Sequence, residues 1–183
     1  MTKYLLHGGI TRDVNSENEG FFSEMVTELS RGRVLLVYFA REENEVEDCR
    51  REDVARFLQF DKELEFEVAT EENLEEQIKS ADVIYLRGGK TEWLVEKMGK
   101  VSSLKELFEG KVVGGFSAGV YVLAKYYFEN DTEELGEGLG ILNIKAFCHY
   151  SPDRKDILDK LISFKENLPV LTLPNYKWVT IYK

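Results

Sequence analysis

Short apolar runs alternate with longer stretches of helical spacing through the first 110 residues, and this alternation restricts the fold more than any other feature. β-forming runs occupy residues 4–7, 34–40, 64–69, 83–86 and 111–113. Helical spacing occupies residues 17–29, 45–60, 73–80 and 91–108, the last broken near Gly99. The pattern predicts right-handed crossovers and a mostly parallel sheet with helices on both faces, a three-layer α/β sandwich.

The rest of the chain continues with elements of both kinds. We expect a helix over 118–127, an acidic loop over 129–137, a strand over 144–148 and a helix over 154–164. Two final strands, 170–173 and 178–182, are expected at a sheet edge. With 183 residues and no low-complexity linker, the chain is expected to form one α/β domain over residues 1–183.

Composition excludes several classes of partner. Acidic residues outnumber basic ones 34 to 24, a net charge of −10, which disfavours nucleic acid. No apolar run approaches the roughly 20 residues that cross a bilayer, and the chain enters a strand pattern at once, so we expect no membrane partner and a cytoplasmic location. Two separated cysteines, two histidines and the glycines at 8, 9, 88 and 89 form neither a metal set nor a dinucleotide motif, so no metal or cofactor is expected.

The segment Gly115-Phe116-Ser117-Ala118-Gly119 lies between a predicted strand and a predicted helix. This context predicts a nucleophile elbow, a sharp turn that lifts one side chain above the sheet and needs small flanking residues. A tight structural turn is the alternative. The first turn of the following helix would direct N–H groups, including that of Ala118, toward the nucleophile. Ser117 is therefore our candidate nucleophile.

A serine hydroxyl needs an adjacent base, and the chain offers only two histidines. His149 ends a predicted strand that we expect beside the elbow on the same sheet edge, and it is the candidate general base. His7, before Gly8-Gly9, is more typical of a structural histidine. Asp131 is the first choice for the carboxylate that orients the base, and Glu129 is the second.

Further candidates follow predicted strands. Gly88-Gly89 follows the run 83–86, and the N–H of Gly89 is a candidate second oxyanion donor, with a plain turn as the alternative. Arg41 and Arg87 also follow strands, and a guanidinium there suits an anionic substrate group. Exposed, salt-bridged arginines are the alternative. Cys148, beside the candidate base, is expected to be a buried core residue.

Three motifs together resemble the aspartyl dipeptidase (peptidase E) family, which includes cyanophycinase. They are Arg87-Gly88-Gly89-Lys90-Thr91, the Gly115–Gly119 elbow, and Gly138-Leu139-Gly140 followed by Cys148-His149-Tyr150, which together span most of residues 82–150. Lys90 and Cys148 depart from the asparagine and proline usual in this family.

The resemblance implies a class I glutamine amidotransferase-like fold with a flavodoxin-like central sheet. It also implies a serine peptidase in which Ser117 attacks, His149 moves the proton, and N–H groups near Gly89 and Ala118 hold the oxyanion. Small members of the family remove an N-terminal acidic residue from short peptides, and Arg154 is a candidate for their substrate-binding arginine.

Two other functions stay open on the sequence alone. One is an α/β protein without catalysis that binds an anionic metabolite or peptide, and the other is an amidase or esterase that uses the same site. The expected partner is a small peptide substrate. The oligomeric state is open, with a homodimer as one option.

Overall fold

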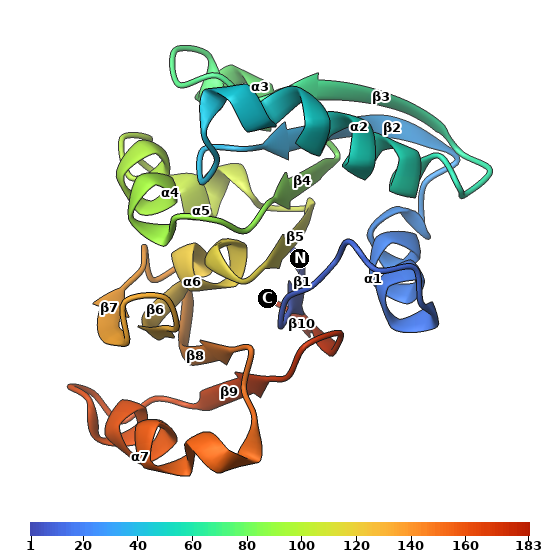
Figure 1. Cartoon of the computed structure of the whole chain (residues 1–183). Coiled ribbons are helices and arrows are strands. Elements are labelled where there is room, and N and C mark those ends of the chain that lie inside the picture. Colours follow the sequence, from blue (N-terminus) through green and yellow to red (C-terminus); the bar gives the residue numbers. More distant parts are fainter.

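The computed structural model describes all residues 1–183, and its largest element is a six-stranded sheet in the order β10-β1-β5-β4-β2-β3 (Figure 1). All neighbouring pairs are parallel except β1–β10, which is antiparallel. The predicted edge position of the last strand is confirmed. The strands are β1 (Lys3–His7), β2 (Arg31–Val37), β3 (Glu63–Val68), β4 (Val83–Leu86), β5 (Val112–Phe116) and β10 (Trp178–Tyr182).

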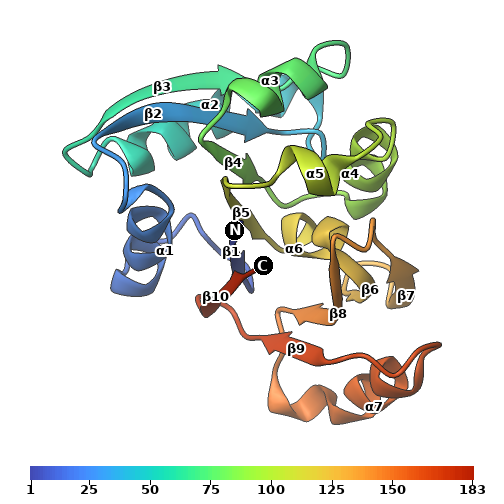
Figure 2. The same cartoon turned by 180° about the vertical axis from the view of Figure 1, so that it is seen from behind.

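Helices cover both faces of this sheet, as the alternating pattern predicts. Successive residues of β2 point to opposite faces, so Val34 and Leu36 pack with helices α1 and α2, whereas Leu35 and Val37 face the other helices. Figures 1 and 2 show the two layers from opposite sides. The helices are α1 (Ser16–Val26), α2 (Val46–Phe57), α3 (Leu74–Ser80), α4 (Thr91–Met98), α5 (Leu104–Leu107), α6 (Ala118–Leu123) and α7 (Lys155–Ser163), with 3₁₀ turns at Glu43–Glu45 and Pro152–Arg154.

A second, four-stranded sheet in the order β7-β6-β8-β9 was not predicted. Its strands are β6 (Ala124–Glu129), β7 (Glu134–Glu137), β8 (Leu142–Cys148) and β9 (Val170–Leu173). The expected helix 118–127 is therefore wrong beyond Leu123, and part of the expected acidic loop is strand β7. The reason is the aromatic run of β6: Tyr127 stacks on Tyr121, while Phe128 turns to the opposite side and packs on Phe147, an alternation typical of a strand.

This topology brings distant segments to the carboxyl end of β5. The end of β8 reaches the elbow after β5 from the second sheet, rather than along the same sheet edge as predicted. The two ends of the chain meet as well, since the N–H of Thr2 donates to the carbonyl of Lys183 at 2.7 Å. None of the helices combines the length and apolar character needed to cross a membrane.

Candidate active site

The elbow between β5 and α6 holds Ser117 in a strained conformation. Its backbone lies at φ 51° and ψ −114°, a region that costs a residue other than glycine on the order of 1–3 kcal/mol. The flanking glycines are required by close packing. A Cβ on Gly115 would lie 2.7 Å from the carbonyl oxygen of Gly119, and a Cβ on Gly119 would lie 2.2 Å from that of Leu86. The local sequence therefore builds the turn that the motif predicts.

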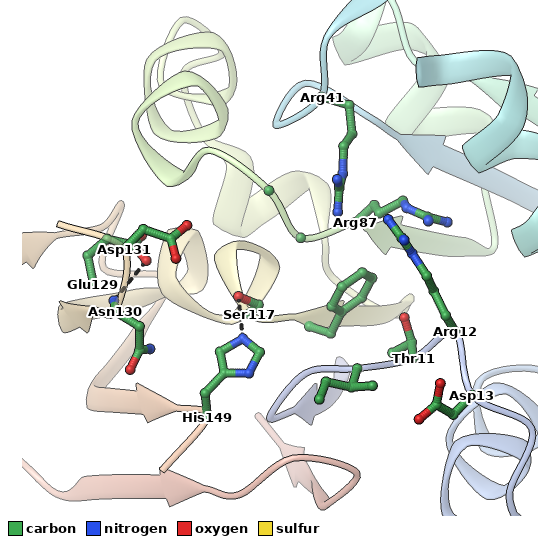
Figure 3. A pocket seen from close by; sticks show the side chains of 14 residues that line it. Thr11, Arg12, Asp13, Arg41, Arg87, Ser117, Glu129, Asn130, Asp131 and His149 are labelled. Atoms are coloured by element: carbon green, nitrogen blue, oxygen red, sulfur yellow. Dashed lines mark hydrogen bonds between the residues drawn. The ribbon is translucent and has the colours of Figure 1, made fainter. Parts of the chain in front are cut away.

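Three side chains form a connected line of hydrogen bonds at this elbow, and Figure 3 shows the first bond, between Ser117 and His149. His149 Nε2 lies 3.0 Å from Ser117 Oγ, and His149 Nδ1 lies 2.6 Å from Asn175 Oδ1. The side-chain amide oxygen of Asn175 accepts a hydrogen bond from His149 Nδ1–H. His149 Nε2 therefore keeps the lone pair that can accept the serine proton. The structure thus brings together the predicted nucleophile and the predicted base in hydrogen-bonding geometry.

The orienting residue at the base is Asn175, which the sequence analysis missed. Glu129 accepts hydrogen bonds from the Thr91 hydroxyl and from the N–H of Asn130, and burial raises the pKa of its carboxyl. Asp131 is exposed and lines the cleft, but Nδ1 of His149 is occupied by Asn175. The expectation that Asp131 or Glu129 orients the base is corrected accordingly. We refer to Ser117, His149 and Asn175, our candidates for catalysis, as the catalytic centre.

Of the two candidate oxyanion donors, Ala118 directly follows Ser117 in the chain and Gly89 lines the same cleft as Ser117. Ala118 is the first residue of α6, where helical geometry leaves N–H groups without an intrahelical partner. Gly89 lines the same cleft at φ +152°, and its N–H donates no hydrogen bond to the backbone. A Cβ on Gly89 would lie 2.2 Å from the carbonyl oxygen of Ala40, so glycine is required at this close approach. Both N–H groups are therefore available to an oxyanion.

A cleft of about 440 Å³ opens above Ser117, with arginines at one end, where Asp13 also lies, and only carboxylates as charged groups at the other (Figure 3). Arg41 and Arg12 extend into one end, while Glu129 and Asp131 lie at the other, with Ser117 between them. We call these the arginine end, which also contains Arg87, and the acidic end. Such a polar cleft suits a small ligand that carries charges of both signs.

The predicted substrate arginines differ in their partners. Arg87 is 2% exposed and pairs with Asp53 at 2.6 Å and Glu52 at 2.7 Å, so it anchors the loop before Gly89. Arg41 is 3.8 Å from its one carboxylate partner, Glu45, and its buried Nε has no hydrogen-bond partner. Arg41 therefore has free capacity for an anion. Arg12 has no carboxylate within 4 Å, and the sequence analysis missed it because no predicted strand precedes it.

Two further candidates lie outside the reacting geometry. Arg154 donates to Asn130 Oδ1 at 2.9 Å and to Glu133 at 3.3 Å, lies over the Phe128 ring, and does not line the cleft. The structure thus gives it a packing role in place of the predicted contact with substrate. Cys148 is fully buried, and burial raises the pKa of its thiol, so its thiolate is disfavoured. No group of three or more His, Cys, Asp or Glu side chains is arranged to hold a metal ion.

Comparison with known proteins adds the family. Residues 5–183 match the family described as Peptidase family S51. No curated protein sequence matches the chain. Among solved structures, a peptidase from an acI-B1 Actinobacterium superimposes with a TM-score of 0.72 at 18% identity, covering 98% of this chain and 83% of that one. A candidate peptidase E from Listeria monocytogenes EGD-e gives 0.70 at 17% identity, covering 99% and 94%. At these identities the superpositions show a shared fold.

Proposed function

Because this chain belongs to peptidase family S51, a family of serine-type peptidases, we propose that it hydrolyses short peptides through an acyl-enzyme on Ser117. One observation carries the proposal: Ser117 Oγ lies 3.0 Å from His149 Nε2, whose ring is oriented by Asn175. A nucleophile, a base and a residue that orients the base are the parts that acyl transfer requires.

The first half of the reaction forms the acyl-enzyme. Ser117 Oγ attacks the peptide carbonyl carbon while its proton passes to His149 Nε2. The carbonyl oxygen becomes an oxyanion that accepts hydrogen bonds from the N–H groups of Gly89 and Ala118. The C–N bond then breaks, and the proton on Nε2 passes to the leaving amine. Asn175 keeps Nδ1 protonated throughout, so Nε2 is the atom that takes up and releases the proton.

The second half returns the enzyme to its starting state. A water molecule gives a proton to His149 Nε2 as its oxygen bonds to the acyl carbon, and the same N–H groups hold the second oxyanion. The ester bond to Ser117 Oγ then breaks, and Oγ recovers the proton from Nε2. The product is a carboxylic acid. Buried Cys148 takes no part in either half.

The charges in the cleft support a peptide with an acidic N-terminal residue. The α-ammonium group of such a peptide suits the acidic end, where Asp131 is exposed. Its side-chain carboxylate suits Arg41, whose guanidinium has only a distant partner, with Arg12 beside it. Arg87 anchors the Gly88-Gly89 loop and does not contact the substrate, because its guanidinium is already paired with two carboxylates.

Matched substrates test this proposal. We expect the wild-type protein to cleave Asp-Leu at least roughly tenfold faster, in kcat/KM, than the isosteric Asn-Leu, and Arg41→Ala to bring the two rates together. Ser117→Ala is the control that reports contaminating peptidases. Equal cleavage of both dipeptides by the wild-type protein would remove the acidic preference, and no cleavage of any short peptide by folded protein would remove the proposal.

A third substrate, Asp-Leu-amide, identifies which carboxylate Arg41 binds. If the side-chain carboxylate is the ligand, the amide is cleaved as fast as Asp-Leu. If Asp-Leu-amide is cleaved slowly while Asp-Leu and Asn-Leu are cleaved equally fast, Arg41 binds the C-terminal carboxylate. The proposed preference for an acidic N-terminal residue is then wrong.

A further inference from the structure

Three consecutive carbonyl groups at the carboxyl end of β1 hold the backbone of the catalytic centre. The carbonyl of His7 accepts the N–H of Ser117 at 3.2 Å, and that of Gly8 accepts the N–H of His149 at 2.9 Å. The carbonyl of Gly9 accepts the N–H of Tyr176 at 3.1 Å, directly after Asn175. One short turn therefore contacts the elbow, the end of β8 and the loop after β9.

The same turn also packs against the imidazole of His149. Gly9 lies at φ +124°, and a Cβ there would be 2.0 Å from Cε1 of His149. A Cβ on Gly8 would lie 2.1 Å from the carbonyl oxygen of Pro174, the residue before Asn175. A displacement of this turn would therefore move the base, its ring and the loop that orients it.

A buried side-chain pair holds the turn in place. His7 is 0% exposed, and its Nδ1 accepts the N–H of Gly9 at 3.0 Å. With Nδ1 accepting, Nε2 carries the proton and donates to Asn18 Oδ1 at 2.9 Å. Asn18, also 0% exposed, donates from Nδ2 to the carbonyls of Ile10 and Asp13 at 2.9 and 2.8 Å. The pair thus fixes the chain from Gly9 to Asp13, which lines the cleft.

We propose that His7 is a positioning residue, whose Nδ1 fixes the Gly8-Gly9 turn so that Ser117, His149 and Asn175 meet in reacting geometry, while Asn18 holds the adjoining residues Ile10 and Asp13. The inference rests on the proposed function for its kinetic consequence, but its geometric content is independent of it. An uncharged acceptor is required at Nδ1, because an imidazolium would present an N–H to the N–H of Gly9.

The surroundings of His7 keep that acceptor available. Burial lowers the pKa of His7 to about 4. The hydrogen bond to Asn18 and the charge of Glu17 oppose this lowering of the pKa, whereas the charge of His149 adds to it. The ring of Phe21 packs 4.8 Å from the imidazole. At neutral pH the ring is therefore uncharged, and its Nδ1 is free to accept.

Two carboxamide variants, each with its amide near the position of one ring nitrogen, separate positioning from simple core packing. In His7→Asn the amide oxygen is as many bonds from Cβ as Nδ1 and can accept the N–H of Gly9. In His7→Gln the amide reaches the place of Nε2 and leaves that N–H without an acceptor. We expect His7→Asn to keep kcat within roughly threefold, and His7→Gln to lower kcat by roughly 10- to 100-fold with KM unchanged, since small misplacements of reacting groups are costly.

Ile78→Val is the matched control for stability. Ile78 is fully buried on α3, away from the cleft, and the substitution removes one buried methylene. A kcat near wild type in Ile78→Val, with a lowered melting temperature, shows that stability alone does not set the rate. Equal kcat values in His7→Gln and His7→Asn would overturn the positioning role.

A readout without catalysis keeps the inference testable if no peptide is cleaved. The chain has only two histidines, so nitrogen NMR of the imidazoles resolves His149 in every variant. We expect the hydrogen-bonded Nδ1–H signal of His149 to persist in His7→Asn and to weaken or shift in His7→Gln. An unchanged His149 signal in folded His7→Gln would overturn the inference, whereas absent hydrolysis by the wild-type protein would count only against the proposed function.

Discussion

Ser117 and His149 of the catalytic centre and Arg41 of the arginine end line one cleft but differ in how closely their polar groups are held. In the catalytic centre, both ring nitrogens of His149 have partners, at 3.0 and 2.6 Å. At the arginine end, Arg41 is 3.8 Å from its one carboxylate partner and has a buried Nε without any. This difference is the one expected if the catalytic centre reacts and Arg41 binds, because reacting groups benefit from fixed positions and a binding group needs free hydrogen-bonding capacity.

Arg87 has the close carboxylate partners that Arg41 lacks. Arg41 follows β2 and Arg87 follows the neighbouring β4, so both lie at the same edge of the sheet. Asp53 and Glu52, on helix α2, take both ends of the Arg87 guanidinium. The partner supplied by a distant segment decides the role. The following predictions test this contrast, from the largest expected effect to the smallest.

Removal of the nucleophile should have the largest effect. In Ser117→Ala the attacking oxygen is absent while the cleft and both of its charged ends remain. We expect peptide hydrolysis to fall by at least roughly 10⁴-fold in kcat, with binding of a substrate dipeptide retained. Steady-state kinetics and calorimetric titration measure the two quantities. Residual activity within tenfold of wild type would place the nucleophile elsewhere.

Breaking the buried anchor should affect stability. In Asp53→Ala the Arg87 guanidinium stays buried with Glu52 as its one carboxylate partner, and loss of one member of a buried pair costs about 3–5 kcal/mol of unfolding free energy. Glu52 is half exposed, so Glu52→Ala should cost no more than about 1 kcal/mol. Urea unfolding compares the two variants. Similar losses would contradict the assignment of Asp53 as the anchor.

Acid should destabilise the support beneath the catalytic centre. The pKa of His7 is about 4 in the folded chain and near 6.5 when unfolded, so the unfolded chain binds a proton in this window that the folded chain excludes. The contribution of uncharged His7 to the free energy of unfolding is fully present above about pH 6.5. It falls by roughly 2–3 kcal/mol as the pH is lowered toward 4. His7→Asn should lack this component when urea unfolding is compared at pH 7 and pH 4.5. An identical pH dependence of unfolding in the wild-type protein and in His7→Asn would contradict this contribution of His7.

Substitution of Asn175, the uncharged residue that orients the His149 ring, should have the smallest effect of the four. Asn175→Ala frees the His149 ring, and we expect kcat to fall by roughly 10- to 100-fold, since misoriented catalytic groups lose about that much. Asn175→Asp places a carboxylate against Nδ1–H and favours the imidazolium, so the acid limb of the kcat/KM profile should move to higher pH. Unchanged kinetics in both variants would remove Asn175 from the site.

Ser117 and His149 could be predicted because their signals are local: a small-residue turn after a strand, and a histidine at the end of a strand. Asn175 could not, because it lies 26 residues after His149, in the loop between β9 of the second sheet and β10 of the first. The second sheet was missed because residues 124–129 continue an apolar run that also suits a helix. Arg87 was misassigned because its partners, Glu52 and Asp53, come from a helix that the sequence does not place beside it.

Covalent labelling tests the central claim most directly. A fluorophosphonate reacts with a serine only when an adjacent base activates it, and intact-mass and peptide mass spectrometry locate the adduct. We predict one adduct on Ser117 in the wild-type protein and none in folded His149→Ala over the same time. An adduct on another residue, no adduct on the folded wild-type protein, or equal labelling of His149→Ala would contradict activation of Ser117 by His149.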